Sequence, residues 1–219
     1  MNNTKIKLCG LSRLEDIKEA NRLKPDYIGF VFWEKSRRNV PFDKAGELKM
    51  ALLPGIKAVG VFVDEAPERI AGLLKEGTID VAQLHGHEDE EYIKRLRTLA
   101  PGNPIIKAFV IRNKEDLEVA EKSSADLLLL DSGTGTGKAF DHELLKEAAI
   151  TKPYFLAGGL SPDNVGKAID VLSPFGVDVS SGIETNGVKD PVKMRKFIEA
   201  AKSAGKDTDK SAKQEESLL

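Results

Sequence analysis

Three features of the sequence predict an α/β protein, a single-domain (β/α)8 barrel (TIM barrel). Eight short apolar runs with the composition of strands recur at intervals of roughly 22 to 30 residues, and a helical pattern follows each of them. Residues 127–130 are all leucine, which indicates a strand covered on both faces, as in parallel sheets. Near-regular repetition of one βα unit is typical of a closed barrel and not of an open sheet.

The first expected strand, 5–9, shows a clear alternation. Lys5, Lys7 and Cys9 fall on one face, and the apolar residues between them fall on the other, which should be covered by helices. Cys9 is therefore expected at the mouth of the barrel. The other strands are predicted over 27–32, 57–63, 80–85, 104–110, 126–131, 153–157 and 177–180.

Start signals mark several of the helices. Ser12 is the expected cap of the first helix and Asn113 that of the fifth, while Pro67 suits the first turn of the third. The acidic segment 87–91 opens the fourth helix. The predicted helices run over 13–23, from 42, over 67–75, from 87, over 114–122, over 141–149, from 161, and over 191–202.

The chain length of 219 residues allows a substantial core, and one barrel domain over 1–204 is the simplest organisation. Residues 205–219 are rich in Lys, Asp, Ser and Glu and contain almost no apolar side chains. We expect this segment to be a disordered tail.

The bulk properties exclude several classes of function. A net charge of −2 argues against nucleic acid or an acidic membrane as the main partner. No apolar run approaches the ~20 residues of a membrane span, and the amino terminus lacks a signal-peptide core. The single cysteine rules out an internal disulfide and a cysteine-based zinc cluster, and three scattered histidines suggest no metal site. These features fit the reducing cytoplasm.

The glycine-rich loop 133–139 looks like a nucleotide-binding P-loop but departs from that motif. Only three residues separate Gly133 from the Gly137-Lys138 pair, where the motif needs four, and Ala139 has no hydroxyl for magnesium. We therefore do not expect ATP or GTP binding here.

In a barrel of this kind, function lies in the loops that follow the strands. The candidate residues at these strand ends are Cys9, Arg37, Arg38, His85, Asp131, Gly158, Gly159, Ser180, Ser181 and Gly182. Asp131 ends the leucine strand, where it could carry chemistry or merely cap the next turn.

The clusters after strands seven and eight predict a phosphate site. Barrels that act on phosphorylated substrates bind the phosphate with these two loops. Gly158 and Gly159 let backbone N–H groups approach an anion, and Ser180 and Ser181, followed by Gly182, add hydroxyl donors. The alternative is two ordinary tight turns.

The positions of Lys7 and His85 in the predicted strands suggest what each side chain contacts. Lys7, one step below Cys9, would be buried and needs a partner, and Asp178 on the neighbouring eighth strand is the expected one. His85 could meet a substrate or bond the backbone of its own loop. His87 and His142 fall at helix starts, where a structural role is expected.

These residues resemble the phosphoribosylanthranilate isomerase family of tryptophan biosynthesis. The resemblance extends over all eight strands and leaves out only the tail. The matching segments are Lys7-Leu8-Cys9-Gly10, Gly29-Phe30-Val31-Phe32, Ser36 to Arg38, Val59-Gly60-Val61-Phe62-Val63, Gln83-Leu84-His85-Gly86, Asp131 with Gly135-Thr136-Gly137 and Phe140-Asp141, Ala157-Gly158-Gly159-Leu160, and Asp178-Val179-Ser180-Ser181-Gly182-Ile183-Glu184.

The resemblance implies an Amadori rearrangement of N-(5-phosphoribosyl)anthranilate that needs neither cofactor nor metal. It implies that Asp131 is the general acid that opens the furanose ring, and that Cys9 is the general base that removes the C2′ proton. It also implies that Arg38 contacts the anthranilate group, since Lys35-Ser36-Arg37-Arg38 matches a Lys-Ser-x-Arg pattern of the family. A thiol can be tuned toward neutral pKa, and an apolar strand end can raise the pKa of an aspartic acid.

The chain departs from the family pattern at two places. The loop between Asp131 and Gly135 is shorter than usual, which bears on closure over the substrate and on product release. His142 stands where a tryptophan is common, and we interpret it as a packing change on the outer helix.

Two alternative functions are a different sugar-phosphate barrel enzyme and a non-catalytic phosphate-binding barrel. A histidine-pathway isomerase would show aspartates at strands one and five, where Cys9 and Val110 stand. An indole-glycerol-phosphate synthase would use lysines and glutamates at several strand ends. A binding module would need neither Cys9 nor Asp131. The expected partner is a phosphorylated small molecule, and the chain is expected to be a monomer or a homodimer.

Overall fold

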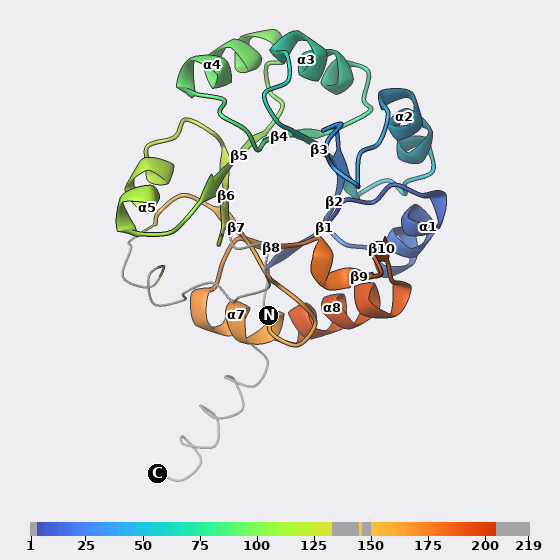
Figure 1. Cartoon of the computed structure of the whole chain (residues 1–219). Coiled ribbons are helices and arrows are strands. Elements are labelled where there is room, and N and C mark those ends of the chain that lie inside the picture. Colours follow the sequence, from blue (N-terminus) through green and yellow to red (C-terminus); the bar gives the residue numbers. More distant parts are fainter. Residues whose placement is uncertain (1–3, 133–144, 146–149, 205–219) are drawn as a thin grey trace.

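The computed structural model describes residues 4–132, 145 and 150–204 and shows a closed barrel of eight parallel strands in sequential order (Figure 1). The strands are β1 (Lys5–Cys9), β2 (Tyr27–Val31), β3 (Lys57–Phe62), β4 (Val81–Leu84), β5 (Ile105–Val110), β6 (Leu127–Asp131), β7 (Tyr154–Ala157) and β8 (Gly176–Val179). β1 pairs with both β2 and β8, which closes the ring. The predicted fold class is confirmed, and all eight predicted strands agree within one residue at either end.

Helices surround the barrel on its outside (Figure 1). They are α1 (Leu14–Leu23), α2 (Phe42–Met50), α3 (Pro67–Lys75), α4 (Glu90–Leu99), α5 (Lys114–Glu121), α7 (Val165–Leu172) and α8 (Pro191–Ser203). The helix predicted over 141–149 lies outside the described residues except for Leu145, which is helical and buried. The predicted tail 205–219 and His142 also lie outside them, as does the P-loop-like segment. No helix in the described ranges is long and apolar enough to cross a membrane.

The helix starts confirm two of the predicted signals and correct one. The Asn113 side chain accepts a hydrogen bond from the backbone N–H of Asp116, and Pro67 occupies the first turn of α3. Ser12 does not cap α1. Instead the Asp16 carboxylate accepts hydrogen bonds from the backbone N–H groups of Ser12 and Arg13, both at 3.1 Å. A carboxylate in the first turn is a stronger acceptor than a hydroxyl and also interacts favourably with the helix dipole.

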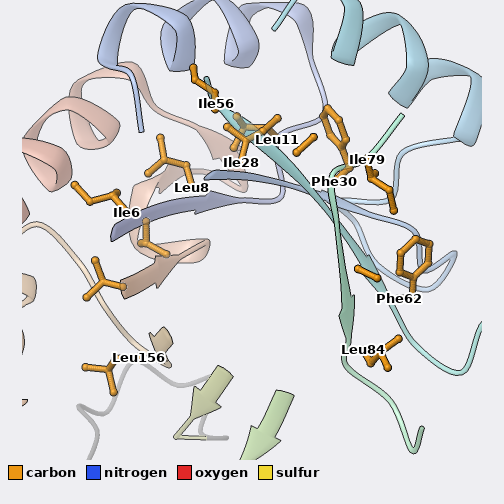
Figure 2. Close-up of a cluster of buried hydrophobic side chains, with 14 of the residues drawn as sticks. Ile6, Leu8, Leu11, Ile28, Phe30, Ile56, Phe62, Ile79, Leu84 and Leu156 are labelled. Carbon is orange, nitrogen blue, oxygen red and sulfur yellow. The ribbon is translucent and has the colours of Figure 1, made fainter. Parts of the chain in front are cut away.

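Two apolar layers hold the barrel together. The larger one lies between strands and helices and includes Ile6 and Leu8, both nearly inaccessible to solvent (Figure 2). The smaller one fills the barrel interior with Val59, Val81, Ile106, Leu127, Leu129, Phe155 and Ala157. Full burial of a side chain of this kind contributes about 1.5–3 kcal/mol. The interior layer reaches Ala157 at the carboxyl end of β7, where polar side chains begin to line the barrel.

Candidate active site

A cavity of about 350 Å³ opens at the carboxyl ends of the strands. Its lining includes six of the residues singled out in the sequence, which are His85, Asp131, Gly158, Gly159, Ser180 and Ser181, together with Asp178. Cys9, Arg38 and Gly182 do not line this cavity but lie next to residues that do. The structure therefore brings most of the candidate residues together around one cavity.

Cys9 is the last residue of β1 and is 6% exposed. Gly29 stands opposite it on β2, and a Cβ added at Gly29 would lie 2.7 Å from the Cys9 sulfur. The absence of a side chain at Gly29 thus leaves the room that the thiol occupies.

Lys7 lies fully buried one step below Cys9 on the same face of β1. Its ammonium donates to Asp178 Oδ1 at 2.8 Å and also interacts electrostatically with Cys9, raising its own pKa. The predicted Lys7–Asp178 pair is confirmed. Burial by itself would lower the pKa of Lys7, but Asp178 and Cys9 outweigh this effect and raise it. Lys7 therefore carries its positive charge at neutral pH beneath the thiol.

Burial raises the pKa of the Cys9 thiol, and Asp178 adds to this shift. The nearby ammonium groups of Lys7 and Lys189 oppose it, because they favour the thiolate. Cys9 thus rests as a thiol with two cations placed to stabilise its charged form.

Asp131 ends β6 at the cavity and is partly buried. Its backbone carbonyl accepts a hydrogen bond from the Ile111 N–H at 2.9 Å, which fixes the strand end. Gly158 approaches it closely, since a Cβ there would lie 2.9 Å from Asp131 Oδ1, and Gly158 has a φ of +88°. Only a glycine fits this position without displacing the carboxylate.

The loops after β7 and β8 are in direct contact with each other. A Cβ at Gly182 would lie 1.9 Å from the Leu160 carbonyl oxygen, so the two loops could not come together with any other residue there. Asn164 fastens the first loop by donating to the Gly159 carbonyl at 2.9 Å. The second loop contains a short 3-10 helix, η1 (Ser181–Ile183). The two predicted clusters therefore lie side by side and line the same cavity.

His85 is exposed into the mouth, and its Nδ1 lies 3.1 Å from the buried side-chain amide of Gln83. Its partner is thus a neighbouring side chain and not the backbone of its own loop. The surrounding protein atoms lower the pKa of His85, although Asp131 and Asp178 oppose this shift. The imidazole is neutral at neutral pH. His87 instead bonds Asp64 in the loop after β3, at 3.0 Å, in agreement with a structural role.

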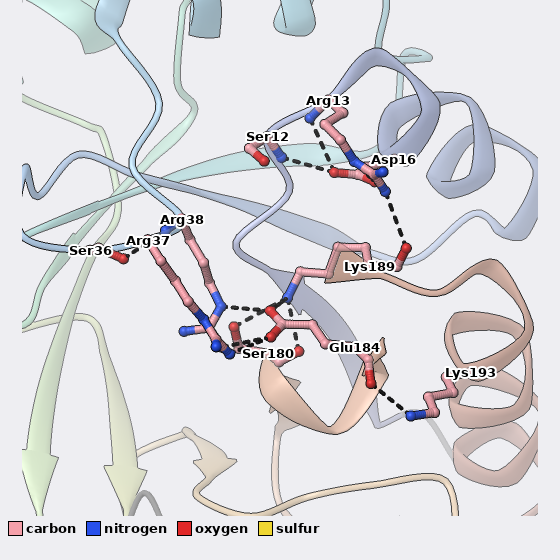
Figure 3. A network of polar contacts seen from close by, with 10 residues as sticks. All are labelled: Ser12, Arg13, Asp16, Ser36, Arg37, Arg38, Ser180, Glu184, Lys189 and Lys193. Carbon is pink, nitrogen blue, oxygen red and sulfur yellow. Dashed lines mark hydrogen bonds and ion pairs between the residues drawn. The ribbon is translucent and has the colours of Figure 1, made fainter. Parts of the chain in front are cut away.

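Arg38 lies beside the cavity and is held by Glu184, a residue whose role the sequence did not reveal. The Arg38 Nε donates to Glu184 Oε1 at 2.6 Å, and its Nη2 donates to Oε2 at 3.0 Å (Figure 3). Arg37 is more exposed but also bonds Glu184, at 2.7 Å. Burial tends to raise the pKa of Glu184, but Arg38 and Lys189 hold it at about 2. Glu184 is therefore ionised throughout the physiological range.

Lys189 is the second functional candidate that the sequence did not reveal. It is 5% exposed and donates to Glu184 Oε1 at 2.7 Å and to the Ser180 carbonyl at 2.8 Å. Glu184 closes the last matching segment of the sequence and could have been noticed there, whereas nothing in the pattern around Lys189 marks it. In the described ranges no three His, Cys, Asp or Glu side chains are arranged to hold a metal ion.

The comparisons with known proteins agree with one another. The sequence pattern of a family described as N-(5'phosphoribosyl)anthranilate (PRA) isomerase matches residues 6–200. N-(5'-phosphoribosyl)anthranilate isomerase of Clostridium acetobutylicum is 47% identical over 201 residues, which cover 89% of this chain and 96% of that protein. The protein of the same name from Thermoanaerobacter sp. (strain X514) is 44% identical over 200 residues, with the same coverage of both chains.

Solved structures give the same result. The phosphoribosyl anthranilate isomerase of Thermotoga maritima superimposes with a TM-score of 0.82 at 36% identity, covering 91% of this chain and 99% of that one. A second such structure, in complex with reduced 1-(o-carboxyphenylamino)-1-deoxyribulose 5-phosphate, has a TM-score of 0.80 at 35% identity with the same coverage.

Proposed function

The chain belongs to the N-(5'-phosphoribosyl)anthranilate isomerase family, and we propose that Cys9 and Asp131 carry out the isomerisation as general base and general acid. The enzyme is an aldose–ketose isomerase of tryptophan biosynthesis. It converts N-(5-phosphoribosyl)anthranilate into 1-(2-carboxyphenylamino)-1-deoxyribulose 5-phosphate, an internal hydrogen shift that consumes no oxidant or reductant.

One observation carries the assignment of the two groups. Cys9 and Asp131 end β1 and β6, and the two strands that lie between them, β7 and β8, supply the glycine and serine loops. A substrate whose phosphate is bound by those loops would have its sugar between the thiol and the carboxyl group. This arrangement suits a reaction that needs one acid and one base at neighbouring carbons.

The steps follow from this placement. Protonated Asp131 gives its proton to the furanose ring oxygen as the bond from C1′ to that oxygen breaks, which leaves an open-chain Schiff base. The Cys9 thiolate then removes the C2′ proton, and the electron pair of that C–H bond forms the enolamine. Tautomerisation of the enolamine to the ketone delivers a proton to C1′ and completes the reaction.

Lys7 supports the base in this scheme. A buried thiol with a raised pKa is seldom ionised, so a fixed cation next to it is needed to make the thiolate accessible. Asp178 in turn keeps Lys7 charged.

The remaining site residues bind the substrate in this proposal. The phosphate contacts backbone N–H groups and hydroxyls of Gly158, Gly159, Ser180, Ser181 and Gly182, and His85 contacts the sugar from the opposite side of the cavity. Arg38 binds the anthranilate carboxylate. Its bonds to Glu184 use Nε and Nη2, and a guanidinium has five N–H donors, so donors are left for the ligand.

The decisive experiment follows turnover of freshly formed substrate through the loss of anthranilate fluorescence. Wild-type protein should turn the substrate over rapidly, whereas Cys9→Ser and Asp131→Asn should slow it by about 10² to 10⁴-fold. Unchanged rates in both variants would exclude the assigned roles. Absence of wild-type turnover with phosphate still bound would favour a binding module.

We also propose that the enzyme works in the cytoplasm as a monomer or a homodimer. A solved structure of the Thermotoga maritima relative is described as monomers generated from a dimeric phosphoribosylanthranilate isomerase, so both states are known among similar proteins. Light scattering of the full chain at several concentrations decides between the two states.

A further inference from the structure

The segment after η1 forms a small hairpin that is not one of the eight barrel strands. It consists of β9 (Glu184–Thr185) and β10 (Val188–Lys189), and their pairing sets Glu184 directly opposite Lys189. Both side chains are buried, at 8% and 5% exposed, and their charged ends are 2.7 Å apart. A buried ion pair at the rim of a site calls for an explanation, because it costs desolvation and is rarely needed for stability.

Each member of this pair contacts one of two parts of the binding site, which we call its arms. One arm is the loop after β8 with Ser180, and the other is Arg38 in the loop after β2. Lys189 donates to the Ser180 carbonyl at 2.8 Å and lies 3.3 Å from its hydroxyl oxygen, at the loop after β8. Glu184 holds the guanidinium of Arg38, from the loop after β2, by two nitrogens (Figure 3). The chain of contacts Ser180–Lys189–Glu184–Arg38 therefore joins the loop assigned to the phosphate with the arginine assigned to the carboxylate.

The two arms also meet at Gly10, which leaves little freedom between them. A Cβ there would lie 2.5 Å from Arg38 Cδ and 3.2 Å from Ser180 Oγ. The aliphatic part of the arginine is therefore packed beside the phosphate loop, while its charged end is fixed by Glu184.

We propose that Glu184 and Lys189 are positioning residues that act as a strut, setting the spacing between Arg38 and Ser180 before a ligand binds. The inference rests on the function proposed above, since it takes the two arms to hold the two anionic ends of one substrate. A rigid spacing removes the need to order two loops during binding, and it selects substrates whose carboxylate and phosphate are separated by the matching length.

A purely electrostatic role for Glu184 makes the opposite prediction. Glu184 carries a negative charge close to an anion site, so replacing it with a neutral residue would strengthen anion binding if charge alone mattered. If Glu184 acts as a strut, the same replacement weakens binding because Ser180 and Arg38 lose their fixed positions.

The test measures the dissociation constant of inorganic phosphate by calorimetry on the full-length protein. Glu184→Gln removes the charge and keeps the shape, whereas Glu184→Asp keeps the charge and shortens the side chain. Both variants should bind phosphate about tenfold more weakly than the wild type. Equal or tighter binding in either folded variant would overturn the proposal. If Glu184→Gln fails to fold, Glu184→Asp alone tests the proposal. This variant keeps the charge, so a purely electrostatic role predicts an unchanged phosphate affinity.

A matched control comes from the opposite end of the barrel. Asp80 accepts from Lys49 and from the backbone N–H of Ala58, so Asp80→Asn breaks an ion pair far from the site. Its phosphate affinity should equal that of the wild type. An equal loss in this control would mean that general destabilisation causes the effect, and the strut would be rejected.

A kinetic measurement separates this inference from the catalytic assignment. In both Glu184 variants the KM for the phosphoribosyl substrate should rise more than kcat falls, and loss of folded enzyme cannot raise KM. If Cys9→Ser and Asp131→Asn proved fully active, the proposed catalytic roles would be wrong. The phosphate affinity of the Glu184 variants would still test the strut independently. An unchanged KM together with unchanged phosphate affinity would reject it.

Discussion

The Lys7 ammonium lies 2.8 Å from Asp178 Oδ1 and favours the thiolate form of Cys9, two residues along the same strand. Lys7 and Asp178 are register partners on β1 and β8, so the closure of the barrel itself creates the pair. The register of the two closing strands thus fixes the cation that lies beneath the thiol.

Replacing Lys7 should impair catalysis by making the thiolate harder to form. Lys7→Met removes the cation that lowers the pKa of Cys9, so the pKa rises further and activity moves to higher pH. A thiol pKa that is higher by about 1 reduces the thiolate fraction at neutral pH about tenfold. The pH profile of kcat/KM checks this, and an unshifted profile would contradict it.

The same variant leaves Asp178 without its partner, so the protein should also lose about 3–5 kcal/mol of stability. Lys7→Met combined with Asp178→Asn serves as the control. The double variant should recover stability in urea unfolding but not activity, because the thiol still lacks its cation.

Gly29→Ala should disturb Cys9 directly. The new Cβ would lie 2.7 Å from the sulfur and 3.2 Å from the Cys9 Cα, so the thiol must move or the strands must separate. We expect kcat to fall by at least about tenfold and the melting temperature to drop. Gly46→Ala is the matched control. Nothing lies within 4 Å of its added Cβ, and alanine in the helix α2 should raise stability by about 0.5–1 kcal/mol with normal activity.

Glu184 should make stability depend on pH in acid. Its pKa is lowered from 4.5 to about 2 in the folded protein, so its contribution is present above pH 4.5 and is lost as the pH falls toward 2. That contribution is about 3 kcal/mol at neutral pH. Urea unfolding of wild type and Glu184→Gln should show a stability gap at pH 7 that closes between pH 4.5 and 2. A gap that does not vary with pH would contradict the assignment.

Lys107 should act as a structural clamp under the loop that carries His85. Its ammonium donates to the Gly86 carbonyl at 2.7 Å and to the buried Glu88 carboxylate at 2.8 Å. Lys107→Met should therefore destabilise the protein by about 3–5 kcal/mol, measured by chemical unfolding. Lys44→Met, which breaks an exposed pair with Glu47, should leave the unfolding midpoint unchanged.

The fold and the Lys7–Asp178 pair were predictable because both depend on simple periodicities. The alternation of β1 places Lys7 and Cys9 inside, and counting strands places Asp178 beside Lys7. The cap of α1 was predicted incorrectly. The Asp16 carboxylate accepts from the backbone N–H groups of Ser12 and Arg13, and only the folded turn shows which of the two polar side chains, Ser12 or Asp16, serves the start of the helix. A single-sequence rule cannot rank two such acceptors.

The strut could not be predicted, because β9 and β10 have two residues each and carry no pattern that marks a strand. The role of Glu184 depends on Arg38, which is distant in sequence and approaches only when the loops after β2 and β8 meet. Local sequence carries no information about such a meeting.

The position of the Lys7–Asp178 pair has a consequence for how the enzyme is made. The thiol assigned as the base comes from the first strand of the barrel, and the carboxylate that keeps the neighbouring lysine charged comes from the last one. A nascent chain, or a fragment that stops before β8, has the thiol but lacks the counter-ion, the second phosphate loop and the closing ladder. We therefore expect a barrel that lacks β8 to be inactive.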